Sequence, residues 1–280
     1  MDINALQTLL FVPANRPERF DKALASGADA IIIDLEDAVP AAEKDAASGT
    51  LATWLDSQPA NSVLIRINGT GSPWFNQDTN LCRSAAVAGI IVPKADDPAA
   101  LKELAHITEK PLLPFIESAV ALARLNEIAA APGVTRLLFG KLDLALDLGM
   151  DYPPPAGEAL NETAFLYARS QLVMCSRVHG LAAPIDAIYT AIHDAKGLTD
   201  YARQGMRLGF SGFLLIHPAQ VAPAQKALTP TSAQISWARH IMDAEQREKG
   251  AVVAVSGNMV DTPVMARARR ILELASDVYK

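Results

Sequence analysis

The sequence predicts an α/β protein folded as a (β/α)8 TIM barrel, and two observations lead to this expectation. Short apolar runs rich in Ile, Leu and Val recur along the chain, each ending in a polar or charged cluster, and helix-like segments fill the gaps between them. Apolar runs without a polar face are typical of parallel strands buried on both sides. Because strand order cannot be read from a sequence, a doubly wound open sheet is the alternative.

Eight strand-like runs occur in order. The first two, LLFVPA (9–14) and AIIIDLED (30–37), are each followed by a helix-like segment. The other six are VLIRIN (63–68), GIIVPK (89–94), PLLPFIE (111–117), TRLLFG (135–140), AAPID (182–186) and GFLLIH (212–217). We expect a catalytic barrel domain at 1–230 and a C-terminal helix and lid segment at 231–280, which is too short for an independent core.

The composition argues against several classes of protein. Lys and Arg total 25 against 31 Asp and Glu, so we expect no binding to nucleic acid or to a membrane surface. The start of the chain lacks a basic segment, and its first apolar stretch is too short for a signal peptide or a span, which favours the cytoplasm. Cys82 and Cys175 lack ligand or disulfide spacing and are interpreted as reduced packing residues.

Two carboxylates end neighbouring strands of the predicted barrel. Glu117 and Asp143 are each the first acid at or just beyond an apolar run, so they would converge on one rim. Mg²⁺ takes one or two protein carboxylates and leaves positions for substrate oxygens, so this pair suits Mg²⁺ better than a dedicated Ca²⁺ cage. The alternative is that both acids cap the helices that follow them.

Arg66 is the second candidate. In VLIRIN, strand alternation places Arg66 and Asn68 on one face, toward the barrel interior. A buried guanidinium needs a carboxylate, supplied by a ligand or by the protein. Asp34 and Glu36 of the preceding strand are the protein candidates, and both kinds of partner could coexist.

Basic residues gather in the first βα turn. Arg16, Arg19 and Lys22 stand at the start of a helix, where positive charge opposes the helix dipole unless an anion such as phosphate binds there. A solvated basic face is the alternative. His217 ends the last strand and is interpreted as a turn residue rather than an acid–base catalyst. The Pro-rich stretch 147–159 is expected to be a rim loop that shapes the substrate pocket.

Several of these segments closely resemble the citrate lyase beta subunit family of the HpcH/HpaI aldolase superfamily, with malyl-CoA and citramalyl-CoA lyases as relatives. The resemblance spans essentially the whole chain and is carried, in order, by LLFVPANRPERFDKALASGADAIIIDLEDAV, IRING, IIVPKAD, PFIESAVAL, LLFGKLDLALDLG and GFSGFLLIHPAQV.

The resemblance implies a Mg²⁺-dependent barrel enzyme that cleaves or forms a C–C bond between a 2-oxo acid and an acetyl thioester. It implies that Glu117 and Asp143 hold the metal and that Arg66 holds the carbonyl and enolate oxygens. Positions that match coenzyme A contacts are Phe11, Arg16 and Lys22. The tail resembles a lid whose aspartate, here Asp261, reaches a neighbouring subunit's active site, so a homotrimer or hexamer is implied.

The chain departs from the family pattern at three positions, Ala14, Ser118 and Lys141. Lys141 lies two residues from a proposed metal ligand and leaves the subfamily open. The expected reaction is retro-aldol cleavage of citramalyl-CoA or malyl-CoA. The alternatives are a malyl-CoA-type thioesterase and a citrate lyase subunit that acts on a carrier-protein thioester. Pyruvate, glyoxylate and oxaloacetate all stay open as the oxo product.

Overall fold

The computed structural model describes residues 1–153, 162–247, 253–255 and 258–277. The chain divides into two compact units, Met1–Gln225 and Lys226–Lys280, and each is described by itself. The predicted rim loop 147–159 lies partly outside the described residues.

The first unit is a closed barrel of eight parallel strands that pair in sequence order, with the eighth returning to the first. The fold prediction is confirmed, and the open sheet is wrong because β1 and β8 pair directly. The strands are β1 (Thr8–Pro13), β2 (Ala30–Asp34), β3 (Val63–Arg66), β4 (Val87–Val92), β5 (Leu112–Ile116), β6 (Arg136–Phe139), β7 (Ala182–Asp186) and β8 (Gly212–Leu215).

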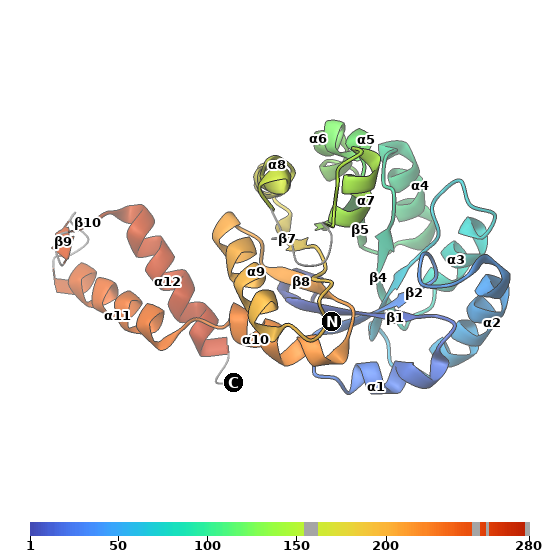
Figure 1. The fold of residues 1–280 in the computed structure, drawn as a ribbon, viewed down its shortest axis with the longest axis horizontal. Coiled ribbons are helices and arrows are strands. Elements are labelled where there is room, and N and C mark those ends of the chain that lie inside the picture. The colour runs from blue at the N-terminus through green and yellow to red at the C-terminus, as the bar shows by residue number, and fades with distance from the viewer. Residues whose placement is uncertain (154–161, 248–252, 256–257, 278–280) are drawn as a thin grey trace. The chain divides into compact units, whose positions relative to one another are not determined.

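Helices lie around these strands (Figure 1). They are α1 (Phe20–Leu24), α2 (Lys44–Leu55), α3 (Phe75–Cys82), α4 (Pro98–Thr108), α5 (Ala119–Ala123), α6 (Leu125–Ala129), α7 (Lys141–Asp147), α8 (Leu166–Val178), α9 (Ala195–Leu208) and α10 (Val221–Leu228). Within the described residues, no helix combines the length and apolar character needed to cross a bilayer.

The barrel interior is packed with apolar side chains rather than open. Alternate residues of the strands point inward, as Leu9, Ile32 and Leu64 do, and they form one core cluster with Ile3 and Leu6 from the segment before β1. That segment is held by Arg136, whose Nη1 donates to Ile3 O (2.9 Å) and Leu6 O (2.6 Å). The N-terminal segment therefore closes the end of the barrel where the strands begin.

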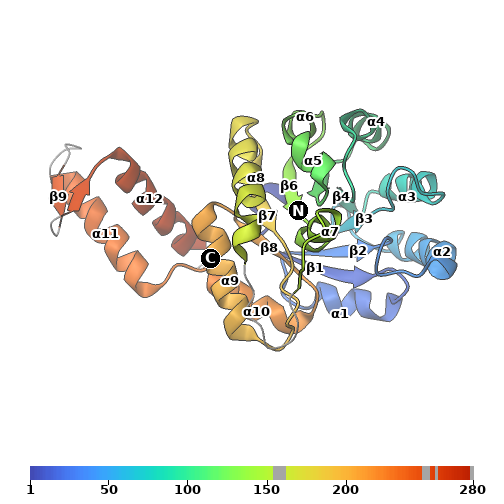
Figure 2. The same ribbon diagram turned by 45° about the horizontal axis from the view of Figure 1, so that its top comes forward.

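The second unit is built on two long helices, α11 (Ser232–Arg247) and α12 (Thr262–Asp277), which lie side by side in both views (Figures 1 and 2). Their shared core includes Ala238, Ile241, Met265 and Ala268. The apolar run between the helices forms an antiparallel pair, β9 (Val253–Val255) with β10 (Asn258–Val260).

Candidate active site

A cavity of about 370 Å³ opens where the barrel strands end. It brings together Arg66, Glu117, Asp143 and Phe11, which come from four different parts of the sequence. Its other walls are Pro13, Asp34, Asp37, Ala38, Phe115, Phe139, Gly140, Lys141, Leu142, Ala187, Ile188, Leu214 and Ile216. The strand ends of a (β/α)8 barrel are the usual place for catalysis, so this cavity is the candidate active site.

Arg66 is held by carboxylates of the preceding strand and its loop. Its Nε and Nη2 donate to the two oxygens of Asp34 at 2.6 Å each, a bidentate pair between residues that are direct register partners across β2 and β3. Its Nη1 lies 3.2 Å from Glu36 Oε2 and 3.3 Å from Asp37 Oδ2. The predicted protein partners of Arg66 are therefore present, and both lie within contact distance at once.

The surrounding acids keep Arg66 charged in a buried place. Burial alone would lower the pKa of the Arg66 guanidinium, but Asp34, Glu36 and Asp37 outweigh it, so the pKa lies above its ordinary value. Two aromatic rings cover the same group, with Arg66 Cζ 4.9 Å from the Phe11 ring centroid and 5.9 Å from that of Phe115. Arg66 thus presents a fixed positive charge to the cavity.

Glu117 is a buried carboxylate, 4% exposed, at the end of β5. Its Oε1 accepts a hydrogen bond of 2.7 Å from the backbone N–H of Lys94. Burial raises the pKa of Glu117 to about 8, the Lys94 hydrogen bond opposes this, and the negative charges of Asp143 and Glu36 add to it. The helix-capping alternative is wrong for this residue, because Ser118 caps α5 by accepting from Ala121 N.

Asp143 lies in the first turn of α7 and faces the same cavity. Burial and the nearby charge of Asp37 raise the pKa of its carboxyl group, while Lys94 and Arg66 act in the opposite direction. The negative charge of Asp143 also raises the pKa of buried Glu117, and a cation bound between the two carboxylates would relieve this cost.

The donor set fits magnesium. Glu117 and Asp143 are hard oxygen ligands, and Mg²⁺ needs no more than one or two of these from a protein. Among the described residues, no group of three or more His, Cys, Asp or Glu side chains could hold a metal ion. Gly140 keeps space open here, since a Cβ on it would lie 2.6 Å from Glu117 Oε2.

Lys141, the departure from the family pattern, is only 2% exposed and lines the cavity. Its Nζ lies 4.2 Å from the ring centroid of Tyr201 and 5.6 Å from that of Tyr152. Its charge also lowers the pKa of buried Asp186, which burial raises and Arg169 lowers. The ammonium group thus lies near Tyr201 of α9 and acts on the carboxyl group of Asp186 at the end of β7.

The remaining residues singled out in the sequence do not line this cavity. Arg16 and Lys22 are exposed, on the turn after β1 and on α1, and are not among the residues that line the cavity. Asp261 belongs to the second unit, where its Oδ1 accepts from Val264 N (3.3 Å) at the start of α12. His217 caps a turn by accepting from Ala219 N (3.1 Å), as its interpretation as a turn residue predicted.

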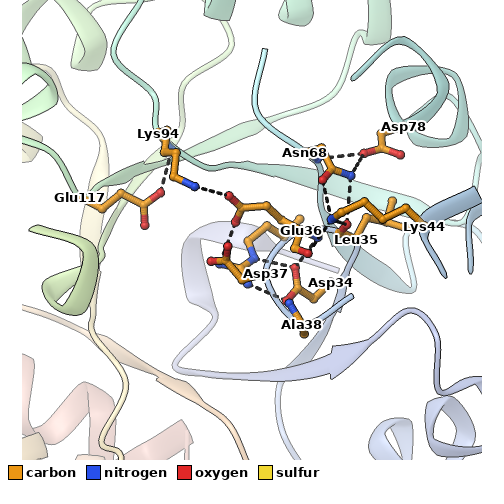
Figure 3. Close-up of polar contacts among 11 residues, drawn as sticks. Asp34, Leu35, Glu36, Asp37, Ala38, Lys44, Asn68, Asp78, Lys94 and Glu117 are labelled. Atoms are coloured by element: carbon orange, nitrogen blue, oxygen red, sulfur yellow. Dashed lines mark hydrogen bonds and ion pairs between the residues drawn. The ribbon is translucent and has the colours of Figure 1, made fainter. Parts of the chain in front are cut away.

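Sequence reasoning missed Lys94 and Phe115. Lys94 follows β4 in a left-handed backbone conformation (φ 45°), and its Nζ donates to Glu36 Oε1 at 2.8 Å while its backbone N–H holds Glu117. Figure 3 shows Lys94 between these two acids. The charge at the end of the apolar run GIIVPK was the available signal, because it is the same kind of position that drew attention to Glu117.

Comparisons with known proteins agree with this geometry. The family model described as HpcH/HpaI aldolase/citrate lyase matches residues 7–218. A citrate lyase subunit beta-like protein of Deinococcus radiodurans is 36% identical, with 95% of this chain and 96% of the relative covered. A (3S)-malyl-CoA thioesterase of Cereibacter sphaeroides is 32% identical, with coverage of 97% and 95%.

A solved structure is similar over almost the whole chain. It is the crystal structure of the protein CitE from Mycobacterium tuberculosis in complex with magnesium, acetoacetate and coenzyme A. The TM-score is 0.88 at 33% sequence identity, and the match covers 98% of this chain and 100% of that one.

Proposed function

Because the chain belongs to the HpcH/HpaI aldolase/citrate lyase family and is an enzyme of the lyase class, we propose that it is a magnesium-dependent lyase of 3-hydroxyacyl-CoA thioesters. The proposed substrate is of the citramalyl-CoA or malyl-CoA type, and the products are acetyl-CoA and a 2-oxo acid. The similar structure that holds magnesium, acetoacetate and coenzyme A supports a metal, a small oxo acid and a CoA thioester as ligands.

One observation carries this proposal: a fixed guanidinium and two carboxylates, one of which raises the pKa of the other, line the same cavity. A retro-aldol cleavage needs a site for a hydroxyl and a carboxylate on one side, and positive charge for the developing enolate on the other. Glu117 and Asp143 supply the first requirement as ligands of Mg²⁺, which when bound would acidify the substrate hydroxyl. Arg66 supplies the second.

The chain's own residues have distinct roles in this reaction. Arg66 stabilises the negative charge that moves onto the thioester oxygen as the C–C bond breaks, and Asp34 keeps its guanidinium in place through the bidentate pair. Phe11 and Phe115 keep water away from the same group. Glu117 and Asp143 orient the half of the substrate that leaves as the 2-oxo acid.

The second unit supplies the proton in this proposal. Residues 231–280 form a lid over a neighbouring subunit of a homotrimer or hexamer. Asp261 delivers a proton to the enolate carbon there, while the proton of the substrate hydroxyl leaves to solvent as the C–C bond breaks. Arg16 and Lys22 bind the phosphates of coenzyme A, since both are exposed cations, Arg16 in the turn after β1 and Lys22 on α1. Phe11, whose ring packs on Arg66, contacts the thioester end of the same substrate.

The test is a product analysis. Purified protein with Mg²⁺ is mixed with citramalyl-CoA and, separately, malyl-CoA, and the 2-oxo acid, acetyl-CoA and free CoA are quantified with and without EDTA. Equal amounts of oxo acid and acetyl-CoA that disappear with EDTA support the lyase. Glu117→Ala should lose Mg²⁺ activation, and unchanged metal dependence in that variant would contradict the proposed site.

A thioesterase acting on malyl-CoA-like esters is the second candidate, because a relative with that name is 32% identical over nearly the whole chain. The same cavity would serve it, with water attacking the thioester carbonyl beside Arg66. Release of free CoA without any oxo acid in the same experiment would favour it. Turnover only of a carrier-protein citryl thioester would instead indicate a citrate lyase subunit.

A further inference from the structure

We infer that Lys44 is a positioning residue for the reaction, because it fixes the loop after β2 that holds Arg66 in place. The inference rests on the proposed function for Arg66. Lys44 does not line the catalytic cavity but a neighbouring one of about 560 Å³, beside Glu36 and Asp37, and the hydrogen bonds of its ammonium all go to protein acceptors. Figure 3 shows it on the far side of Glu36 from Lys94.

All three N–H donors of the Lys44 ammonium have acceptors. Its Nζ donates to Leu35 O (2.7 Å), Glu36 O (2.6 Å) and Asn68 Oδ1 (2.7 Å), and the residue is only 7% exposed. An ammonium group has three donors in a tetrahedral arrangement, so these contacts use its full capacity. Two of the acceptors are successive carbonyls of the loop, whose orientation Lys44 thereby fixes.

Asn68 joins this loop to the end of β3. Its Nδ2 donates to Leu35 O (3.0 Å) and to Asp78 Oδ2 (2.7 Å), and its backbone N–H donates to the same Asp78 oxygen (2.8 Å). Asn68 stands two residues after Arg66, and Asp78 comes from α3. The network therefore fastens the loop after β2 to the strand end that carries Arg66.

The loop carries the contacts that hold the guanidinium. Leu35 N donates to Arg66 O (2.9 Å), and the Glu36 carboxylate meets Arg66 Nη1 at 3.2 Å. The Asp34 carboxylate accepts from Glu36 N (3.0 Å) and Ala38 N (3.1 Å) as well as from Arg66. A shift of the carbonyls held by Lys44 would therefore move both carboxylates that orient Arg66.

Helix formation does not explain a lysine at this position. Lys44 is the first residue of α2, where positive charge opposes the helix dipole, and burying its ammonium costs hydration. Burial accordingly lowers the pKa of Lys44, while Asp34, Glu36 and Asp78 act in the opposite direction. The unfavourable placement is offset by the three contacts that order the active-site loop.

The chain offers a matched control in Lys110. Its Nζ also donates to two backbone carbonyls, Ser84 O (3.0 Å) and Val87 O (2.7 Å), but it lies just before β5 at the opposite end of the barrel. Lys44→Met and Lys110→Met thus each remove two hydrogen bonds to backbone carbonyls. Only the carbonyls bound by Lys44 belong to the active-site loop. Lys44→Arg keeps the charge and several donors, and Lys44→Gln is a milder change in case Lys44→Met does not fold.

Two readouts are compared in all variants with Mg²⁺ present. Backbone hydrogen exchange over residues 33–39 and 63–69 measures how well the loop after β2 and the end of β3 are ordered. Steady-state kinetics on the substrate that the wild type cleaves measure how well Arg66 is placed for the reaction. We expect Lys44→Met to exchange faster in both segments and to lose about tenfold to a hundredfold in kcat, with little change in the Mg²⁺ activation constant. Lys110→Met should show neither effect, and Lys44→Arg should recover part of kcat.

Equal kcat values in Lys44→Met and Lys110→Met would overturn the positioning role. Unchanged hydrogen exchange over residues 33–39 in Lys44→Met would also overturn the positioning role, whether or not any substrate is cleaved. If Lys44→Met does not fold, the same criterion applies to Lys44→Gln. Faster exchange confined to the Lys44 variants, in a protein that cleaves none of the thioesters, would leave the network standing and contradict the proposed lyase activity instead.

Discussion

Glu117 shows how one position can be costly for folding and useful for metal binding. A carboxylate in this place loses most of its hydration and faces Asp143 and Glu36, so the folded protein favours its protonated form. A divalent cation reverses that preference, because it pairs with the ionised form. The residue therefore links proton release to magnesium binding.

The raised pKa of Glu117 predicts a pH dependence of stability in metal-free protein. The folded pKa, about 8, lies above the ordinary value of 4.5, so the folded state binds more protons than the unfolded state between these limits. Stability should therefore fall as pH rises from 4.5 to 8 and level off above 8. The free energy of unfolding, measured with urea in the presence of EDTA, should show this fall for the wild type. The fall should be smaller for Glu117→Gln.

The informative quantity is the difference between the two proteins, because other groups titrate in both. Saturating Mg²⁺ provides the control, since it should diminish the difference above pH 8 by stabilising wild type alone. Parallel pH profiles of wild type and Glu117→Gln in EDTA would contradict the assigned pKa.

Gly140 gives a second prediction at the scale of a residue. A Cβ at this position would lie 2.5 Å from Glu117 Cβ, and the glycine has a negative φ of −104°, so the constraint is space rather than backbone conformation. Gly140→Ala should displace the carboxylate and weaken Mg²⁺ activation about tenfold or more. Gly49→Ala in α2 is the control, because its Cβ would meet nothing within 4 Å. Equal activation constants in the two variants would contradict this role.

At the scale of elements, the two ends of the barrel strands carry different kinds of charged residue. The ends of β2 and β3 place Asp34 opposite Arg66 in register, beside the cavity. At the start of β6, Arg136 is fully buried, and its partners are Ala183 O, Ile3 O, Leu6 O and Ser211 Oγ. Burial lowers the pKa of Arg136 to about 10, and Asp2 and Asp29 oppose the shift. Of these two buried arginines, Arg66 faces the cavity and Arg136 closes the barrel.

Arg136→Met should therefore lower stability without changing the chemistry. The substitution leaves buried carbonyls of the N-terminal segment without donors, which costs about 3 kcal/mol on general experience with such groups. Chemical unfolding would measure the loss, and kcat measured well below the unfolding transition should stay within about twofold of wild type. A large loss of kcat in folded protein would show that the two ends of the barrel are coupled.

At the scale of the whole molecule, the proposed reaction needs residues from both compact units. The barrel carries Arg66, Glu117 and Asp143, whereas Asp261 belongs to the second unit. In the proposed homotrimer or hexamer, Asp261 acts in the site of a neighbouring subunit. Two inactive variants with lesions in different units would then complement each other.

Mixing Asp261→Asn with Arg66→Lys tests this arrangement. Each variant alone should be nearly inactive, and after co-refolding or co-expression in equal amounts about a quarter of the sites should combine an intact Arg66 with a neighbour's intact Asp261. Steady-state turnover of the mixture measures the recovery. A mixture no more active than the separate variants would contradict action between subunits, and normal turnover by Asp261→Asn alone would remove this residue from the mechanism.

The sequence by itself determined the eight strands, because buried parallel strands need continuous apolar runs and such runs are visible without any contact information. It also indicated which charged residues stand at strand ends, and strand alternation was enough to turn Arg66 inward. The roles of Arg66, Glu117 and Asp143 remain proposals, but their meeting in one cavity follows from closure of the barrel.

Only the tertiary structure decided how these residues are held. Contacts such as Lys94 with Glu36, and Lys44 with Leu35 O and Asn68, join residues that are 58, 9 and 24 positions apart in the sequence. Their partners depend on barrel register and on loop carbonyls, which every residue type carries, so residue identity does not reveal them. The pKa of Glu117 depends on the same packing, because desolvation and neighbouring charges exist only once the barrel has closed.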